Sequence, residues 1–524
     1  MVNMRSLLSL GAVVVLAASG TTAASAATRD LAPPQAIRWK GCPSYSDAVL
    51  RGRGLEGQRA QEFRRLLART ECGTLEVPLD YRRPRDKKIT IAVTRLKAAD
   101  PSRRLGALAL NSGGPGGAGY LMPIDHVMMN SANARLNHRY DLIGFDPRGV
   151  GNSDKVDCPP ADEGKGASTG GKPAPGPLTE EAARQIYQQE VAGNQACSRH
   201  DPQFLGQLTT ANIARDMDRI RAALGERKLN FLALSWGTWL GAVYRSMFPH
   251  TVGRMWLDSI AIPRFSTLAF EQGRAEATER NCRRMADWMA ERHATYGFGT
   301  SGEAVQDTLL ALRRHYEADP RTFTDLDIPV TGGTIGMLCA QTSLDWPLTA
   351  TALRELYELR DTPGSAAPPA LKQIYTGNPV EIPPDAPEEF NQTMNRATFC
   401  NEDTGLRDFA SVWSAWRQRL ERNPLTGDFG KFSAMVGCAG WTLPVTDTRV
   451  RDTGTSLQMS GHLHETMSPY TWTTEMQEII GGAVLTVDDD VHGSVLMDPA
   501  CGANVAVYFE SGRLSWGRCS GMRP

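Results

Sequence analysis

The chain has 524 residues, more than one compact core normally holds, so we expect two modules. Hydrophobic residues make up 41% of the chain and charged residues 22%, a composition that excludes wholesale disorder. The formal net charge of -1 produces no field that would attract nucleic acid or an anionic membrane, and neither is expected as a partner.

The N-terminus has the pattern of an export signal. Arg5 supplies a positive charge, residues 7–18 are apolar, and residues 24–26 form a small-residue cleavage site. The apolar run is shorter than the roughly 20 residues that a membrane-spanning helix needs. We therefore expect residues 1–26 to be a signal peptide and the mature protein to be secreted, extracellular and free of the membrane.

Ten cysteines lie in the expected mature chain, and an even number in an exported protein favours disulfides over metal ligands. Zinc would need closely spaced Cys or His pairs, which the sequence lacks, and no metal or cofactor is expected. The order of the cysteines suggests five pairs: Cys42 with Cys72, Cys158 with Cys197, Cys282 with Cys339, Cys400 with Cys438, and Cys501 with Cys519.

Strand-like and helix-like segments alternate on both sides of a helical insertion. The insertion covers residues 264–446, and residues 159–177 are rich in Gly and Pro and predict an exposed loop. The strand-like runs are 72–81, 88–98, 105–111, 140–145, 229–235, 254–261, 455–461 and 483–487; the main helix-like runs are 178–200, 209–225, 270–294, 408–422 and 470–480. This alternation predicts an α/β class in which residues 27–263 and 447–524 build one mostly parallel sheet.

The segment LNFLALSWGTWLG takes a buried strand through Ser235 directly into a helix. Such a nucleophile elbow forces the serine into a strained conformation, so the residues two before and two after it must be small, as Ala233 and Gly237 are. The alternative interpretation is that Ser235 only caps the helix.

A glycine-rich loop, NSGGPGGAG at residues 111–119, follows an earlier apolar strand. Backbone N–H groups in such a loop can stabilise the oxyanion that forms during acyl transfer. We expect one donor from Gly114 and the second from Trp236, the residue after the nucleophile. A plain turn is the alternative, whereas the missing GKS or GKT sequence disfavours a phosphate-binding loop.

A second glycine-rich turn, DPRGVGNSD, follows the strand at 140–145. We interpret it as a structural turn in which Asp146 pairs with Arg148.

The general base is expected at His492, because it follows the last core strand and the chain order of nucleophile, acid and base is then satisfied. His462 and His464 are its competitors. The acid should follow the strand-like run 455–461, where Glu465 is the carboxylate. Residues 488–490, three aspartates, lie too close to His492 in the chain and are interpreted as a solvated turn.

These motifs together resemble those of the secreted bacterial tripeptidyl aminopeptidases, relatives of the proline iminopeptidase branch of the α/β-hydrolases. Residues 113–119 resemble the GGPGxSG loop of that family, residues 146–154 its DxRGxGxS and residues 233–241 its GxSxGTxLG. The resemblance implies an α/β-hydrolase fold with a large helical cap at 264–446. It also implies a tail, residues 500–519, with a helix and a hairpin between two cysteines.

The family's usual acid is an Asp two residues before a Thr-Pro pair. In this sequence Ser468-Pro469 takes the place of the Thr-Pro pair, and the residue at the spacing of the acid before it is Glu465. Counted forward from Gly461 instead, the position of the acid falls on His464. We prefer Glu465 because it places a carboxylate at this position.

The resemblance further implies an exopeptidase that removes short peptides, often tripeptides, from free N-termini. Binding the substrate ammonium needs negative charge near the cap, for which Glu402 and Asp403 are the candidates by resemblance; surface solvation is their alternative. Two other functions stay open: an esterase or amidase acting on small secreted metabolites, and a degenerate hydrolase acting as a binding protein.

Overall fold

The computed structural model describes residues 36–159, 176–362, 364–377 and 382–523. The expected signal peptide and most of the expected loop at 159–177 lie outside the described residues. Within the described ranges, no helix is both long and apolar enough to cross a membrane.

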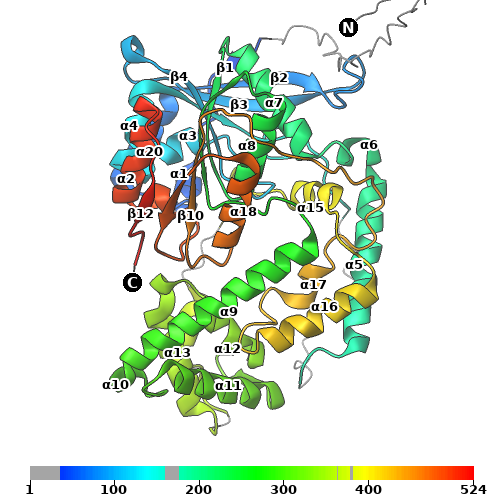
Figure 1. Cartoon of the computed structure of the whole chain (residues 1–524), viewed down its shortest axis with the longest axis vertical. Helices are drawn as coiled ribbons and strands as arrows, with labels where there is room; N and C mark the ends of the chain where they lie inside the picture. Colours follow the sequence, from blue (N-terminus) through cyan, green and yellow to red (C-terminus); the bar gives the residue numbers. More distant parts are fainter. Residues whose placement is uncertain (1–35, 160–175, 363, 378–381, 524) are drawn as a thin grey trace, which may run out of the picture. The chain divides into compact units, whose positions relative to one another are not determined.

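A 10-stranded sheet runs through the described part of the core, in the order β1-β2-β3-β5-β4-β6-β7-β10-β11-β12 (Figure 1). The pairs from β1 to β5 are antiparallel, and those from β5 through β4 to β12 are parallel. The strands are β1 Arg38–Lys40, β2 Thr70–Pro78, β3 Lys88–Leu96, β4 Gly106–Asn111, β5 Tyr140–Phe145, β6 Leu229–Leu234, β7 Val252–Asp258, β10 Gln458–His462, β11 Ala483–Val487 and β12 Gly517–Cys519. The mostly parallel α/β architecture expected from the sequence is confirmed.

Helices cover both faces of this sheet, which is why its central strands are continuous apolar runs such as GALALN and YDLIGF. Residues of α7, α8 and α18 pack in one hydrophobic cluster, and residues of α2, α3, α4 and α20 pack in another. The core helices are α1 Asp47–Gly52, α2 Gly57–Ala68, α3 Met122–Met129, α4 Ser131–Arg139, α5 Glu180–His200, α6 Pro202–Leu205, α7 Thr210–Ala223, α8 Trp236–Met247, α18 Tyr470–Ile480, α19 Ser494–Met497 and α20 Pro499–Ser511.

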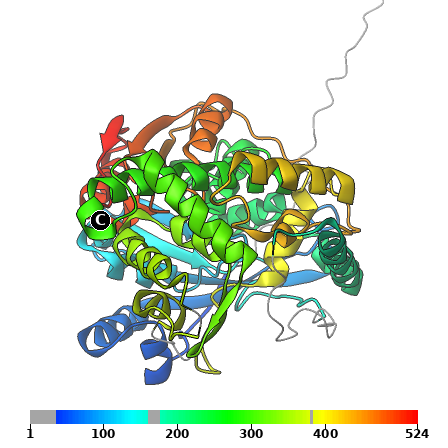
Figure 2. The same cartoon turned by 90° about the horizontal axis from the view of Figure 1, so that it is seen from below.

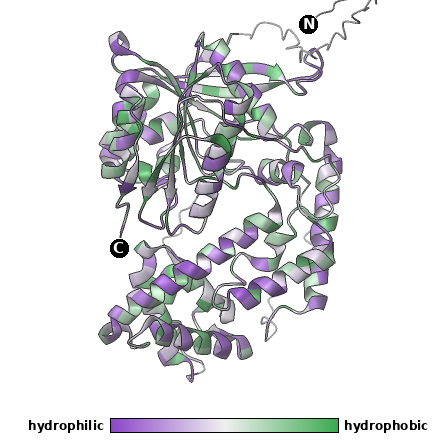
Figure 3. Cartoon of the chain, in the orientation of Figure 1, coloured by the Kyte–Doolittle hydropathy of each residue, from purple (hydrophilic) through white to green (hydrophobic). Residues whose placement is uncertain are grey.

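The segment between β7 and β10 forms a helical layer with its own hydrophobic cluster (Figure 2). Figure 3 shows hydrophilic and hydrophobic colours alternating along its helices, as expected for amphipathic helices packed on one side. The segment contains α9 Thr267–Glu291, α10 His293–Tyr296, α11 Gly302–Ala318, α12 Gly332–Cys339, α13 Trp346–Leu359, α14 Pro369–Thr376, α15 Gln392–Glu402, α16 Phe409–Arg422, α17 Lys431–Met435 and a hairpin of β8 Arg321–Phe323 with β9 Leu326–Val330. The sequence did not predict the hairpin. We call this segment the cap.

The C-terminal tail departs from the expected helix and hairpin. Helix α20 is followed by the single strand β12, which pairs in parallel with β11 and extends the main sheet. The expected hairpin was wrong because the tail finds its backbone partners at the open edge of the sheet.

All five predicted cysteine pairs are confirmed, and no free cysteine is left: Cys42–Cys72, Cys158–Cys197, Cys282–Cys339, Cys400–Cys438 and Cys501–Cys519. The pairs at Cys282 and Cys400 lie inside residues 264–446, and the other three lie outside. The cap is therefore joined to the core by the chain itself and by non-covalent contacts.

Candidate active site

Ser235 stands at the sharp turn between β6 and α8. It has φ 60° and ψ -133°, a strained conformation for a residue with a side chain, and its N–H donates to Asp258 O at 3.0 Å. The strain predicted for this turn is present. The Ser235 side chain makes no capping hydrogen bond to α8, so helix capping does not account for this serine.

Glycine is required two residues after Ser235. A Cβ at Gly237 would lie 2.5 Å from Asn111 Oδ1 and 3.1 Å from the Ala233 Cβ. The methyl group of Ala233 is accommodated because position 237 lacks a side chain. A methyl group at position 237 would therefore crowd both Asn111 and Ala233.

The glycine-rich loop packs directly on this turn. A Cβ at Gly113 would lie 2.6 Å from Leu234 O and 3.0 Å from Trp236 N, so the loop approaches the elbow at backbone contact. Trp236 is the first residue of α8, and the N–H groups of a first helical turn have no acceptor inside the helix. Gly114 and Trp236 both line the cavity that contains Ser235.

Asp146 holds the end of this loop. Its Oδ1 accepts from the N–H groups of Gly119 and Tyr120 at 3.0 Å, and its Oδ2 accepts from Asn152. The expected ion pair with Arg148 is wrong: Arg148 is fully buried and pairs with Asp216 on α7. The backbone donors saturate Asp146, so the guanidinium finds its charge on the neighbouring helix.

The cap also contacts the loop. Ala118 N–H donates to Glu389 O and Asn391 N–H donates to Gly116 O, both at 2.9 Å. A Cβ at Gly114 would lie 3.2 Å from the ring of Phe390. The geometry of the glycine-rich loop thus depends on a cap segment that is distant in sequence. No local sequence motif predicted this contact.

Glu465 and His492 are brought together from the loops after β10 and β11. The Glu465 Oε1 accepts a short hydrogen bond from His492 Nδ1 and another from the Ser468 N–H at 2.9 Å, while its Oε2 accepts from Ser259 Oγ at 2.9 Å. The Glu465 side chain is fully buried. Nε2 is then the ring nitrogen of His492 that can serve a nucleophile.

His464, the competitor for the acid position, lies elsewhere. Its Nε2 is 3.4 Å from Asp488, and burial lowers the pKa of its imidazole. Counting from Pro469 therefore identifies the residue that faces His492.

Ser259 is a residue that the sequence analysis missed. It has φ 54°, its hydroxyl donates to Glu465, and its Oγ accepts from the Gly493 N–H at 2.9 Å. One side chain thus links the loops of Glu465 and His492. Its position directly after a parallel strand was the available signal, because such strand ends converge at one edge of the sheet.

His462, a competitor for the base, is completely buried in a second cluster. Its Nδ1 lies 2.7 Å from Asp489 and its Nε2 3.0 Å from Asp258. Burial alone would lower the pKa of His462, but the adjacent Asp258 carboxylate and then Asp489 raise it well above its usual value. His462 is thus a buried cation between two aspartates rather than a base facing the cavity.

The interpretation of residues 488–490 as a solvated turn was wrong for two of the three. Asp489 and Asp490 are buried. Asp490 accepts from the Ser343 N–H at 2.9 Å and from its hydroxyl at 2.7 Å, and it lies 3.4 Å from Arg284. Asp490 is buried because Ser343 of the cap supplies donors that the local sequence does not show, whereas Asp489 is buried against His462 and Ser494.

A cavity of about 500 Å³ lies beside Ser235. Of the two acids named for ammonium binding, Glu402 lines it and Asp403 does not. Asp403 accepts from the Thr267 N–H at 3.0 Å and lies 3.1 Å from Arg407. Asp403 is therefore occupied with holding the start of α9.

Glu402 is buried, and burial raises the pKa of its carboxyl. It accepts from Thr210 and from Trp239 Nε1. Two further carboxylates line the cavity, Glu190 and Glu271, and the sequence analysis did not single them out. Their helices α5 and α9 are distant in sequence, so the sequence did not predict that both side chains line one cavity.

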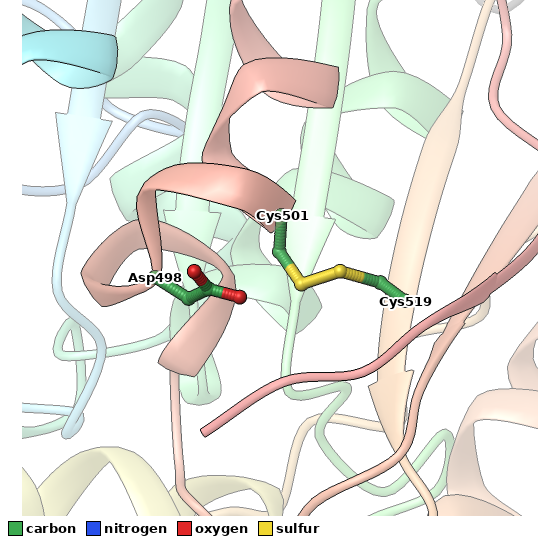
Figure 4. Close-up of side chains that lie close together, drawn as sticks. All are labelled: Asp498, Cys501 and Cys519. Carbon is green, nitrogen blue, oxygen red and sulfur yellow. A yellow bond between two sulfur atoms is a disulfide. The ribbon is translucent and has the colours of Figure 1, made fainter. Parts of the chain in front are cut away.

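One group of potential metal ligands occurs in the described residues, formed by Asp498, Cys501 and Cys519 (Figure 4). The two cysteines are bonded to each other, so neither offers a thiolate. The Asp498 carboxylate accepts from the Ala500 N–H and caps α20. These residues therefore build structure.

The sheet order, the strained serine turn and the cap define the class: the chain has the α/β-hydrolase fold and is a serine hydrolase. Residues 106–362 match the family described as alpha/beta hydrolase fold.

The relatives carry the names of peptidases and of an esterase, at similar sequence identities. The chain is 29% identical to a tripeptidyl aminopeptidase of Streptomyces lividans, over 84% of this chain and 82% of the relative. It is 26% identical to serine protease Hip1 of Mycobacterium bovis, over 82% of this chain and 83% of that protein. It is 28% identical to carboxylesterase B of Mycobacterium tuberculosis, over 84% of each chain. The resemblance to tripeptidyl aminopeptidases seen in the motifs thus extends along most of the chain.

Proposed function

We propose that the protein is a secreted serine exopeptidase that releases short peptides, with tripeptides as the main products, from free N-termini. One observation carries the proposal: the cavity lined by Ser235 is also lined by three carboxylates, those of Glu190, Glu271 and Glu402. A peptide whose carbonyl reaches Ser235 would then have acidic groups in reach of its ammonium. Five disulfides support an extracellular location.

Glu271 is the acid that we propose for the ammonium. Its ion pairs are long, 3.6 Å to Arg274 and 3.5 Å to Arg419, so it can take a closer cation. The Glu402 oxygens already accept from Thr210 and Trp239, which suits a supporting role. The cavity volume of about 500 Å³ falls within the usual range for ligand sites, roughly 300–1,000 Å³.

The proposed mechanism uses Ser235, Glu465 and His492 as a triad. Ser235 Oγ attacks the peptide carbonyl while His492 Nε2 takes the hydroxyl proton, and Glu465 stabilises the imidazolium. The N–H groups of Gly114 and Trp236 stabilise the oxyanion. The C–N bond then breaks, His492 protonates the leaving amine, and water activated by His492 hydrolyses the acyl-enzyme.

The test compares chromogenic tripeptide amides with a free and an N-acetylated terminus. Loss of a charge-assisted contact should lower kcat/KM for the acetylated substrate by about 10- to 100-fold. Glu271→Gln should reduce this preference, whereas Glu276→Gln, on the same helix but outside the cavity lining, should leave it. Ser235→Ala should abolish both activities and labelling by a serine-reactive probe. Equal cleavage of the two substrates would overturn the exopeptidase assignment.

A second candidate function is hydrolysis of small esters, which the similarity to a carboxylesterase favours. The same triad serves both reactions. Higher kcat/KM for simple acyl esters than for tripeptide amides would support the esterase.

A further inference from the structure

A second cavity, of about 360 Å³, lies on the other side of the glycine-rich loop. Its walls are the carboxyl ends of β4 and β6, the start of α3, cap residues 387–389 and Leu496. None of these walls belongs to the first cavity, which is lined by Gly114, Ser235 and the cap helices.

The second cavity adjoins the reacting groups in the chain. Leu234, directly before Ser235, lines it, and so does Ser112, two residues before Gly114. A Cβ at Gly493, the residue after His492, would lie 2.9 Å from the Leu234 side chain. The wall of the cavity is therefore continuous with the loop that carries His492.

The chemistry of the reaction distinguishes the two cavities. The substrate ammonium and the acyl part belong with the acidic first cavity, so the leaving amine points away from it. His492 must deliver a proton to that amine. Leu234, the residue before Ser235, and Leu496, four residues after His492, both line the second cavity, so it adjoins both reacting residues in the chain.

The lining of the second cavity is mostly apolar, with polar atoms that lack partners. It includes the carbon side chains of Leu110, Leu121 and Met122. His126 is 4% exposed, its Nε2 has no hydrogen-bond partner, and burial lowers the pKa of its imidazole to about 4, so the ring is neutral. The buried Asn111 Nδ2 also has no partner.

The charges at the cavity are mainly negative. Arg53 lies 2.9 Å from both oxygens of Asp125 and 2.5 Å from Glu389. Glu388 pairs with Lys155 at 3.1 Å, and Asp146 adds a further carboxylate to the lining. Four lining carboxylates thus face two cations. An acidic side chain entering the cavity would be repelled.

We propose that this cavity is the leaving-group subsite of the peptidase, and that it receives an apolar, uncharged side chain from the residue that follows the scissile bond. This inference rests on the proposed function. It predicts that leucine or methionine at that position is preferred, that lysine is tolerated and that aspartate is disfavoured.

A substitution at Met129 tests the subsite without disturbing the hydrophobic core. Met129 lines the second cavity and is 45% exposed, so Met129→Glu places a charge at the rim without burying it. Met497, 46% exposed and outside the lining, provides the matched control Met497→Glu.

The substrates are tetrapeptides with a constant N-terminal tripeptide and leucine, lysine or aspartate as the fourth residue. In Met129→Glu, the leucine-to-lysine ratio of kcat/KM should fall about fivefold, as expected for one added charge near the surface. In Met497→Glu it should equal the wild-type ratio. A methyl ester of the same tripeptide releases methanol, which is too small to fill the cavity. Its kcat/KM should therefore be the same in all three proteins.

A second readout uses added amines. With the methyl ester as acyl donor, leucinamide should compete with water for the acyl-enzyme more effectively than aspartic acid amide, and Met129→Glu should weaken this advantage. Identical fourth-residue profiles in Met129→Glu and Met497→Glu would overturn the subsite while tripeptide release remains. Failure of all tripeptide substrates would instead overturn the proposed function.

Discussion

At the scale of single residues, Glu465 is the residue that orients the imidazole of His492 in the proposed triad. Its carboxylate is buried and receives hydrogen bonds from His492, Ser259 and Ser468. A carboxylate held by three donors keeps the imidazole in one tautomer and one orientation. His464, one residue away, contacts a different aspartate.

Glu465→Gln tests this position. The amide cannot stabilise the imidazolium and can present an N–H to Nδ1, so we expect kcat to fall by about 10³- to 10⁴-fold with KM little changed. His464→Gln is the matched control and should retain activity within about threefold. Steady-state kinetics on a free tripeptide amide measure both; a larger loss in His464→Gln would move the acid to that residue.

His462 is the second decisive residue, because it is a cation enclosed by carboxylates. Asp258 and Asp489 contact its two ring nitrogens, and Ser494 Oγ lies 3.2 Å from Nδ1. Breaking a buried ion pair by removing one partner is destabilising, by about 3–5 kcal/mol. The cluster joins the ends of β7, β10 and β11, which also carry Ser259 and the loop of His492.

The stability of the protein should depend on pH through His462. Its folded-state pKa is raised, so the stabilisation is complete below the usual histidine pKa of about 6.5 and is lost as pH rises through the folded value. The pKa of Asp489 is lowered by its contact with His462 despite burial. The pH at which Asp489 is protonated and this ion pair is lost therefore lies below the usual aspartate range.

The difference in urea midpoint between wild type and His462→Gln should therefore be larger at pH 5–6 than at pH 9. A His464→Gln control should show a small difference. A difference for His462→Gln that stays constant across this range would contradict the buried cation.

At the scale of elements, the attachment of the cap matters most. No disulfide crosses between residues 264–446 and the rest of the chain. Asp490, in the loop before His492, accepts from both the N–H and the hydroxyl of Ser343, between α12 and α13. The loop of the proposed base and the cap thus share one carboxylate.

Asp490→Asn should loosen this contact, because the amide is a weaker acceptor and loses its attraction to Arg284. We expect faster hydrogen exchange in α12 and α13 and a fall in stability of about 1–3 kcal/mol. Asp488→Asn, at a more exposed aspartate paired with Arg523, is the control and should leave cap exchange unchanged. Equal exchange in both variants would show that Asp490 does not secure the cap.

At the scale of the whole molecule, the patterns that sequence shows best are local and periodic. The continuous apolar runs predicted the central strands, and the strand, serine and helix around Ser235 predicted the strained turn. The disulfides followed from the order of the cysteines because each pair closes a loop of 18 to 57 residues. The prediction for the tail was wrong because β12 pairs with residues of β11 that lie 32 positions earlier in the chain.

The sequence by itself determined the α/β class, the elbow at Ser235 and the five disulfides, because each depends on nearby residues or on simple order. Only the tertiary structure decided that Glu465 rather than His464 faces His492, that Asp490 binds the cap and that Arg148 pairs with Asp216. These outcomes depend on which strand ends and helices become neighbours. The order β7-β10-β11 brings together loops more than 200 residues apart in the chain, such as those of Ser259 and Glu465. A local sequence pattern does not show that two such distant loops become neighbours.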